Sequence, residues 1–238
     1  MRKGLINRER DGKILSGIES LDRIIGGFPE GSVVILLGKP GSGFEIFTLQ
    51  VLFNRCISEG SAIYMNVDRR MDDIFIDLSS KGWNVGDFIK SGKWKFLDAF
   101  SMRMNTARAY GESIGTLIKE YLDGVEKGAW GAIDTFSYFI RTMEEDEVLN
   151  LLDDLIGASR DSRSIQFLMV LDGLHDERTL TKISHLVDGV VRFSLSDEVE
   201  PVGTMEIKKF RLMEHKPRKL VYRITERGLV IETLSRIA

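Results

Sequence analysis

The sequence predicts an α/β domain with a mostly parallel central sheet, helices on its faces and an antiparallel extension at its C-terminal end. Three observations predict it. Apolar segments typical of buried strands alternate with segments of helical apolar spacing along most of the chain. A glycine-rich turn joins the first of these strands to the helix after it, and the last three strands follow one another with few helices between them.

The first strand and helix carry the clearest pattern. The strand, at 32–38, is apolar and β-branched at its start, and in the helix, at 45–58, Ile46, Leu49 and Phe53 have helical spacing. Further strands are expected at 61–67, 94–98, 130–134, 165–171 and 190–195, with helices at 71–82, 113–127, 144–159 and 180–187. Strands at 204–210, 219–224 and 229–233 form the antiparallel extension.

Length and composition indicate one globular domain spanning residues 1–238. Of the 238 residues, 43% are hydrophobic and 29% charged, which is ordinary for a globular protein, and the four prolines are scattered, with no repeat or linker. The one cysteine, Cys56, lies in an apolar run and is expected in the core. Neither a signal-peptide pattern nor a membrane-length apolar segment is present, so we expect a cytoplasmic protein with no membrane partner.

The most informative motif is residues 38–45, Gly-Lys-Pro-Gly-Ser-Gly-Phe-Glu. The phosphate-binding P-loop pattern is G-x-x-x-x-G-K-[ST] between a strand and a helix. Gly38 and Gly43 have its spacing and context, and Gly41 adds backbone freedom. Such a loop turns N–H groups towards phosphate oxygens. Its seven candidate nucleotide-site residues are Gly38, Lys39, Gly41, Ser42, Gly43, Phe44 and Glu45.

Two residues of this loop depart from the pattern. Phe44 stands at the lysine position and Glu45 at the Ser/Thr position. The lysine neutralises the terminal phosphates, and the hydroxyl holds Mg²⁺. Phe44 supplies neither charge nor hydrogen bond, and Glu45 adds a carboxylate that repels phosphate. Glu45 is also an ordinary first-turn residue, because acids are favoured there in any helix.

The chain resembles the archaeal KaiC-like branch of the RecA superfamily over nearly its whole length. The segments that carry the resemblance are residues 15–33 before the loop, 81–84, 91–99, 176–182 and 185–190. The resemblance implies a RecA-like P-loop NTPase fold.

The resemblance also locates the catalytic positions of the family. Its Walker B aspartate, which helps to hold Mg²⁺, falls on Asp134, although an aspartate at a strand end also fits a turn cap. Its pair of glutamates, one of which activates water, falls on Asp68 and Arg69, and an arginine cannot act as a base. We therefore interpret Asp68 and Asp134 as vestigial and expect no catalytic residue.

A basic pair near the C-terminus bears on partners. The family's residues that reach a neighbouring subunit's phosphates fall on Lys209 and Arg211, although a solvated strand face fits them equally. These two belong to a basic concentration that could also meet DNA: Lys208, Lys209, Arg211, Lys216, Arg218, Lys219 and Arg223. The formal net charge of −3 and the scarcity of aromatic residues there do not favour nucleic acid.

The sequence thus predicts a non-catalytic RecA/KaiC-like protein acting as a regulatory or scaffolding subunit, in a homo-oligomer or in a hetero-oligomer with an active paralogue. We expect no cofactor; ATP and Mg²⁺ could bind but would not be hydrolysed. The widely spaced His175, His185 and His215 predict no metal site. Two alternatives stay open: a weak or unconventional ATPase that uses Lys39, and a DNA-binding recombination accessory protein.

A last hypothesis concerns the loop without its lysine. Its N–H groups need an acceptor other than phosphate. Glu45 is expected to turn its carboxylate back towards these donors while Phe44 packs into the vacated space, so that the two close the nucleotide site from within. A solvated Glu45 is the alternative.

Overall fold

Nine strands form one sheet in the computed structural model, which describes residues 12–105, 110–196, 202–211 and 218–232. Six adjacent strands are parallel, and their spatial order is β8-β3-β7-β6-β4-β5. In chain order they are β3 (Val33–Gly38), β4 (Ala62–Asn66), β5 (Trp94–Asp98), β6 (Trp130–Asp134), β7 (Gln166–Leu171) and β8 (Gly189–Leu195). The mostly parallel sheet expected from the alternating pattern is confirmed.

The expected antiparallel extension continues the sheet beyond β8. It consists of β9 (Gly203–Phe210), β10 (Arg218–Thr225) and β11 (Gly228–Glu232), each antiparallel to its neighbour. The β8–β9 pairing shifts register between Val190 and Val191.

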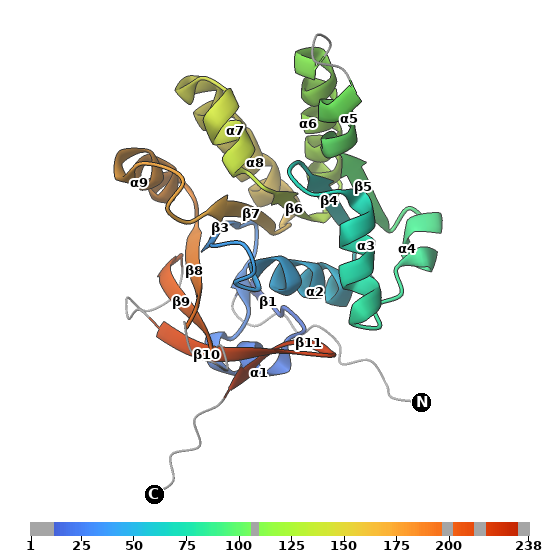
Figure 1. Ribbon diagram of the computed structural model, residues 1–238, viewed down its shortest axis with the longest axis vertical. Helices are drawn as coiled ribbons and strands as arrows, with labels where there is room; N and C mark the ends of the chain where they lie inside the picture. The colour runs from blue at the N-terminus through green and yellow to red at the C-terminus, as the bar shows by residue number, and fades with distance from the viewer. Residues whose placement is uncertain (1–11, 106–109, 197–201, 212–217, 233–238) are drawn as a thin grey trace, which may run out of the picture.

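Helices cover both faces of the sheet (Figure 1), with α1–α3 on one face and α6–α9 on the other. The helices that the apolar spacing predicts are α2 (Phe44–Ile57), α3 (Met71–Ser80), α6 (Tyr110–Glu126), α8 (Glu145–Ser162) and α9 (Glu177–Leu186). Local signals fix several of their ends. The helix α8 begins with a reciprocal capping box between Glu144 and Glu147, and at the start of α9 the Asp176 carboxylate accepts the Thr179 N–H at 2.9 Å.

Several short elements were not expected from the sequence. They are β1 (Lys13–Ile14), α1 (Glu19–Ile25), β2 (Phe28–Pro29), α4 (Gly86–Lys90), α5 (Ala99–Asn105) and α7 (Ser137–Thr142), and β1 and β2 form a separate two-stranded sheet. None exceeds seven residues. Such lengths are too short to show a distinct hydrophobic period.

The core lies in two layers, one on each side of the sheet. One layer packs α2, with buried Phe47 and Leu52, against the sheet; the other packs α6 and α8, with buried Tyr121 and Leu155. Cys56 is fully buried in the first layer, as its apolar surroundings predict. Among the described helices, none combines the length and apolarity needed to cross a bilayer.

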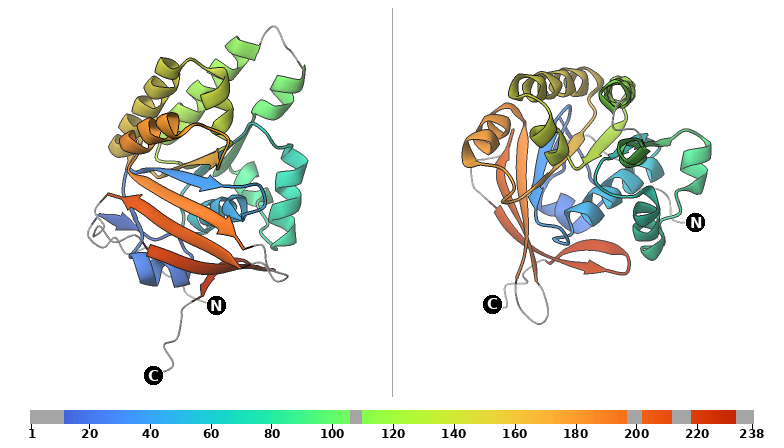
Figure 2. Two further views of the ribbon diagram at one scale, coloured as in Figure 1. Left: turned by 60° about the vertical axis from the view of Figure 1, so that its left-hand side comes forward. Right: turned by 45° about the horizontal axis from the view of Figure 1, so that its top comes forward.

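The topology determines where a site can form. Because the strands β3, β4, β6 and β7 are parallel, their carboxyl ends meet at one edge of the sheet. Both views in Figure 2 show helices on either side of the sheet. In open α/β sheets, ligands bind at this carboxyl edge.

One polar residue inside the apolar strand β7 has a structural explanation. Gln166 is fully buried and receives a hydrogen bond from the Tyr121 hydroxyl at 2.9 Å. Its amide donates to the Ala129 carbonyl at 3.0 Å and to the Ser164 hydroxyl at 2.9 Å. The amide therefore joins α6, β7 and the residue before β6.

Replacing this amide should destabilise the fold. Gln166→Leu leaves the Tyr121 hydroxyl and the Ala129 carbonyl without partners, at roughly 1–3 kcal/mol for each buried group. Urea unfolding should show the loss, and adding Tyr121→Phe should recover part of it by removing one orphaned hydroxyl. An unfolding free energy equal to that of the wild type would contradict this role.

Candidate functional site

The loop between β3 and α2 is a tight turn that contains two glycines with left-handed backbone conformations. Gly41 and Gly43 have φ of 80° and 87°, in the left-handed region that favours glycine. The Ser42 N–H donates to the Lys39 carbonyl at 3.0 Å. Gly43 is the N-cap of α2 and provides no side-chain cap. The glycine positions that the sequence indicates thus form a tight turn that leads into the helix.

Phe44 does not project from this loop. Its ring is fully buried, with its centroid 6.4 Å from that of Phe193 on β8. A Cβ placed on Gly38 would lie 3.1 Å from the Phe44 ring and 2.5 Å from the Ser42 hydroxyl oxygen. That oxygen is buried and has no hydrogen-bond partner among the described residues. Ring and hydroxyl therefore lie against Gly38 at the base of the loop.

The C-terminal extension also contacts the loop. The Tyr222 hydroxyl, on β10, donates a hydrogen bond to the Ser42 carbonyl, and Tyr222 is fully buried. A Cβ on Gly43 would lie 2.6 Å from the end of the Ile224 side chain. Sequence reasoning missed this contact, because Tyr222 lies 180 residues from Ser42 and no local pattern joins them.

Glu45 is half-buried at the first turn of α2. Burial raises the pKa of its carboxyl to about 7, and the nearby Asp134 adds to the rise. The N–H groups of Glu45 itself and of Gly41, together with Arg69, act to lower this pKa. The hypothesis that this carboxylate turns back on the loop donors stays a prediction.

Asp134, at the end of β6, is buried, with a side-chain exposure of 1%. Its Oδ2 accepts the Tyr64 hydroxyl at 2.6 Å, while its Oδ1 has no partner among the described residues. Burial raises the pKa of Asp134 to about 6, although Tyr64 and Arg69 act against the rise. Tyr64 was not anticipated, but it lies on β4, the strand paired with β6.

Arg69 occupies the turn between β4 and α3. One terminal nitrogen of its guanidinium pairs with Asp77 on α3, and the other lies 3.7 Å from Oδ2 of Asp134. Burial acts to lower the pKa of Arg69, but Tyr64, Asp134 and Asp77 raise it, so the cation is retained. A guanidinium therefore stands at one of the two positions where the resemblance places an acid.

Asp68, the other acid expected here, is fully engaged. Its Oδ1 lies 2.9 Å from Arg103 on α5, and its Oδ2 accepts the Thr135 hydroxyl at 2.6 Å. The structure thus brings Asp68, Asp134 and the loop residues to one edge of the sheet, where Asp134 lies beside Arg69 and Asp68 pairs with Arg103.

Lys39 differs from these residues because it is exposed. Its ammonium has no ion-pair or hydrogen-bond partner in the part of the chain that the structure describes. It is therefore free to meet an anion, as the unconventional-ATPase alternative requires.

The arrangement does not fit a magnesium ion. The hydroxyl that would hold the metal is replaced by Glu45, and Oδ2 of Asp134 is occupied by Tyr64 and Arg69. Within the described ranges, no three His, Cys, Asp or Glu side chains gather closely enough to hold a metal.

Lys209 and Arg211 are both bound within the chain. The Lys209 ammonium donates to the carbonyls of Ser184, His185 and Val187 at 2.9, 2.9 and 2.7 Å, which caps the C-terminal end of α9. Nε of Arg211 lies 3.0 Å from the buried Asp188. Their contact with a neighbouring subunit stays a prediction, and making it requires exchanging these bonds.

The other basic residues of this region are largely paired as well. Lys208 lies 2.6 Å from Glu206, and Arg223 pairs with Glu232. Lys216 lies outside the described residues, as does the side chain of Arg218. Lys219 is exposed and has no ion pair among those described.

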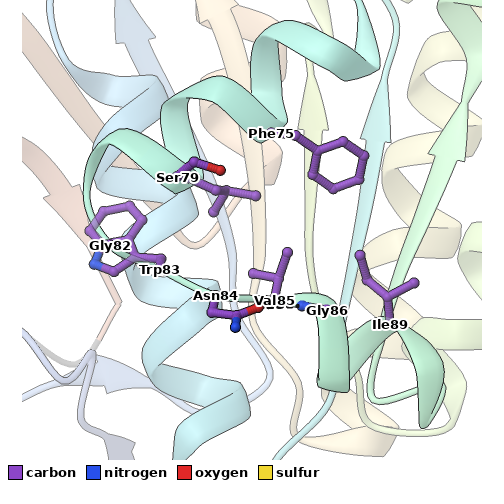
Figure 3. Close-up of a pocket in the computed structure, with 9 residues that line it drawn as sticks. Phe75, Ser79, Gly82, Trp83, Asn84, Val85, Gly86 and Ile89 are labelled. Atoms are coloured by element: carbon purple, nitrogen blue, oxygen red, sulfur yellow. Dashed lines mark hydrogen bonds between the residues drawn. The ribbon is translucent and has the colours of Figure 1, made fainter.

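A separate hollow of about 500 Å³ lies between α3 and α4 (Figure 3). Figure 3 shows Phe75 and Ser79 on α3, and Ile89 on α4. Its lining is mostly apolar and carries no ionisable side chain: Phe75, Leu78, Ser79, Gly82, Trp83, Asn84, Val85, Gly86 and Ile89. Three of these lining residues, Gly82, Trp83 and Asn84, belong to the segment 81–84 that resembles the KaiC-like family. The hollow offers no group for acid–base chemistry.

Comparisons with known proteins agree with this architecture. A family model described as "ATPase: KaiC" matches residues 14–236. The UPF0273 proteins of Aeropyrum pernix and Thermotoga maritima are 27% and 28% identical, over 92% of this chain and over 93% and 95% of those proteins. The circadian clock protein KaiC3 of Synechocystis is 26% identical over 98% of this chain, which spans 48% of that protein.

A solved structure shares the fold. The KaiC-like protein PH0186 from Pyrococcus horikoshii OT3 superposes with a TM-score of 0.74, at 22% identity, over 93% of this chain and 99% of that one.

The buried carboxyl of Glu45 predicts a pH dependence of stability. Its pKa rises from 4.5 to about 7 on folding, so its stabilising contribution is complete below about 4.5 and is lost as pH rises through 7. Glu45→Gln removes the buried charge, so the variant should exceed the wild type in melting temperature at alkaline pH, and the difference should shrink towards acid pH. The exposed Glu19→Gln serves as control; equal pH profiles for wild type and Glu45→Gln would contradict the prediction.

Proposed function

Because this chain belongs to the KaiC family of RecA-like ATPases, we propose that it is a non-catalytic member that acts as a regulatory or scaffolding subunit and does not hydrolyse ATP. The observation that carries the proposal is the Arg69 guanidinium, which pairs with Asp77 and lies 3.7 Å from Asp134. We expect this role in the cytoplasm, since the one cysteine is a free, buried thiol.

Phosphoryl transfer depends on three groups, and each is altered. A lysine stabilises the charge that develops on the phosphates, a hydroxyl holds the metal, and an acid orients water. Phe44 is neutral and fully buried, Glu45 is acidic, and Arg69 cannot accept a proton. From Lys plus Ser/Thr to Phe plus Glu, the loop alone changes by two charges towards negative.

The closed loop supports the same proposal. The Phe44 ring and the Ser42 hydroxyl lie against Gly38, and the Tyr222 hydroxyl donates to the Ser42 carbonyl. These contacts place a ring and a hydroxyl against the turn that surrounds phosphate oxygens in a P-loop. We propose that Phe44 and Glu45 together close the nucleotide site from within.

An intact scaffold with altered chemistry favours a role in assembly. The sheet, its helices and the order of the family-like segments are kept, while the differences gather at the carboxyl edge of β3, β4 and β6. We propose that the chain assembles with itself or with an active paralogue. Lys209 and Arg211 would join such an interface only by leaving the α9 carbonyls and Asp188.

The alternatives rest on fewer groups. An ATPase that uses Lys39 is favoured by the free, exposed ammonium, but that lysine would act without a metal-binding hydroxyl or a base. DNA binding is less favoured, because Lys208, Lys209 and Arg211 are bound within the chain.

The wild-type protein should show no appreciable ATP hydrolysis in a phosphate-release assay with Mg²⁺. The physical reason is the joint replacement of the lysine, the hydroxyl and the base. Turnover at rates ordinary for the family, abolished by Asp134→Asn, would contradict the proposal. Lys39→Ala serves as the matched variant for the unconventional-ATPase alternative.

Restoring the loop should separate binding from hydrolysis. The double variant Phe44→Lys, Glu45→Thr should regain binding of a fluorescent nucleotide, because it removes the buried ring from the loop and changes the local charge by two units towards positive. Turnover should still be absent until Arg69→Glu supplies an acid. A double variant that keeps its circular dichroism spectrum but binds no nucleotide would show that other residues also closed the site.

The chain should also form oligomers, because the shared site of RecA-like proteins is built between subunits. Light scattering and sedimentation at high micromolar concentration should give a mass above 27.0 kDa. A chain that stays monomeric alone and also in a mixture with an active KaiC-family protein from the same source would be evidence against the scaffolding role.

A further inference from the structure

Arg69 places a permanent positive charge 3.7 Å from Asp134, the residue that the resemblance identifies as the family's metal-holding aspartate. We infer that its guanidinium is a built-in cation that takes the place of the metal beside Asp134, so that the closed site is stable with neither metal nor nucleotide. The inference concerns the resting protein and rests on the ion-pair geometry, whether or not ATP is hydrolysed.

The need for a cation follows from the burial of Asp134. Its carboxylate is 1% exposed, and one of its oxygens has no partner among the described residues. Transferring an ionised carboxylate from water into a protein interior costs much free energy unless a counter-charge and hydrogen bonds accompany it. The Tyr64 hydroxyl supplies a hydrogen bond at 2.6 Å but no charge. The nearest positive group in the described ion pairs of Asp134 is Arg69, at 3.7 Å.

The surrounding structure holds Arg69 in this position from both ends. At its backbone, the Asn66 amide donates to the Arg69 carbonyl at 2.9 Å and to the Asp98 carboxylate at 2.8 Å. At its tip, the pairing with Asp77 fixes one side of the guanidinium, while the other faces Asp134. Side-chain exposures of 25% for Arg69 and 32% for Asp77 place the pair in a partly buried setting, where screening by water is reduced.

The planar guanidinium suits this task. Its terminal nitrogens point to two carboxylates at once, one on α3 and one at the end of β6, and so connect the two elements. A lysine carries the same charge on one nitrogen and cannot match that fork. The chain offers a matched pair nearby for comparison: Arg103 with Asp68, at 2.9 Å.

Thermal unfolding of four proteins, each with excess Mg²⁺, with Mn²⁺ and with EDTA, tests the inference. The melting temperature of the wild type should be the same in all three buffers, and so should that of Arg103→Gln. Arg69→Gln should melt lower than both in EDTA, and Mn²⁺ should raise its melting temperature, because the released carboxylate accepts a divalent ion. Arg69→Lys should lie between the wild type and Arg69→Gln and should respond little to metal.

A double-mutant cycle with Asp134→Asn isolates the pair. The unfolding equilibrium constants should show a coupling of about tenfold between Arg69→Gln and Asp134→Asn, since removing both charges leaves no orphan. If Arg69→Gln alone does not fold, recovery of folding in the double variant supports the inference, and failure of both overturns it.

Two further results would overturn it. One is a rise in the melting temperature of the wild type with Mg²⁺ or Mn²⁺ that equals the rise for Arg69→Gln. A metal would then bind even in the presence of Arg69. The other is a coupling near onefold. Both leave the absence of ATP hydrolysis untouched, since that is measured separately on the wild type by phosphate release.

Discussion

A carboxylate buried at the end of β6 needs a counter-charge, and the choice of that counter-charge governs the rest of this site. Asp134 is 1% exposed, so its ionised form depends on the Tyr64 hydroxyl and on the Arg69 guanidinium 3.7 Å away. An arginine is always charged, unlike a metal site that fills and empties. Because Arg69 also pairs with Asp77, the same guanidinium connects β6 to α3 at the carboxyl edge of the sheet.

The loop after β3 is likewise contacted by side chains of this same chain. Gly41 and Gly43 have left-handed backbone conformations and form the tight turn between β3 and α2. Glu45 is half-buried at the start of α2, the Phe44 ring lies against Gly38 at the base of the loop, and the Tyr222 hydroxyl donates to the Ser42 carbonyl from the C-terminal extension. In the proposed non-catalytic role, these contacts take the place of the bulk and order that a nucleotide supplies to an active P-loop.

The sequence was sufficient to predict the strands and helices, but not the side-chain contacts between different elements. Strand and helix periods are local, so β3, α2 and the later elements lie where the pattern predicts them. The burial of Phe44 and the pairings of Arg69 with Asp77, and of Tyr222 with Ser42, depend on residues far apart in the chain or on different faces of different elements. The family resemblance located Arg69 and excluded it as a base, but its role as a partner of Asp134 required the turn between β4 and α3 in three dimensions.

The central claim is that this chain's own side chains occupy the place of nucleotide and metal. Isothermal titration of the wild-type protein with ATP, in the presence and absence of Mg²⁺, tests it most directly. The account predicts no saturable heat of binding under either condition, because the Phe44 ring lies at the base of the loop, Tyr222 binds the loop, and Oδ2 of Asp134 accepts the Tyr64 hydroxyl beside Arg69. Saturable binding of ATP that strengthens with Mg²⁺ would contradict it, since both the loop and the metal position would then be open.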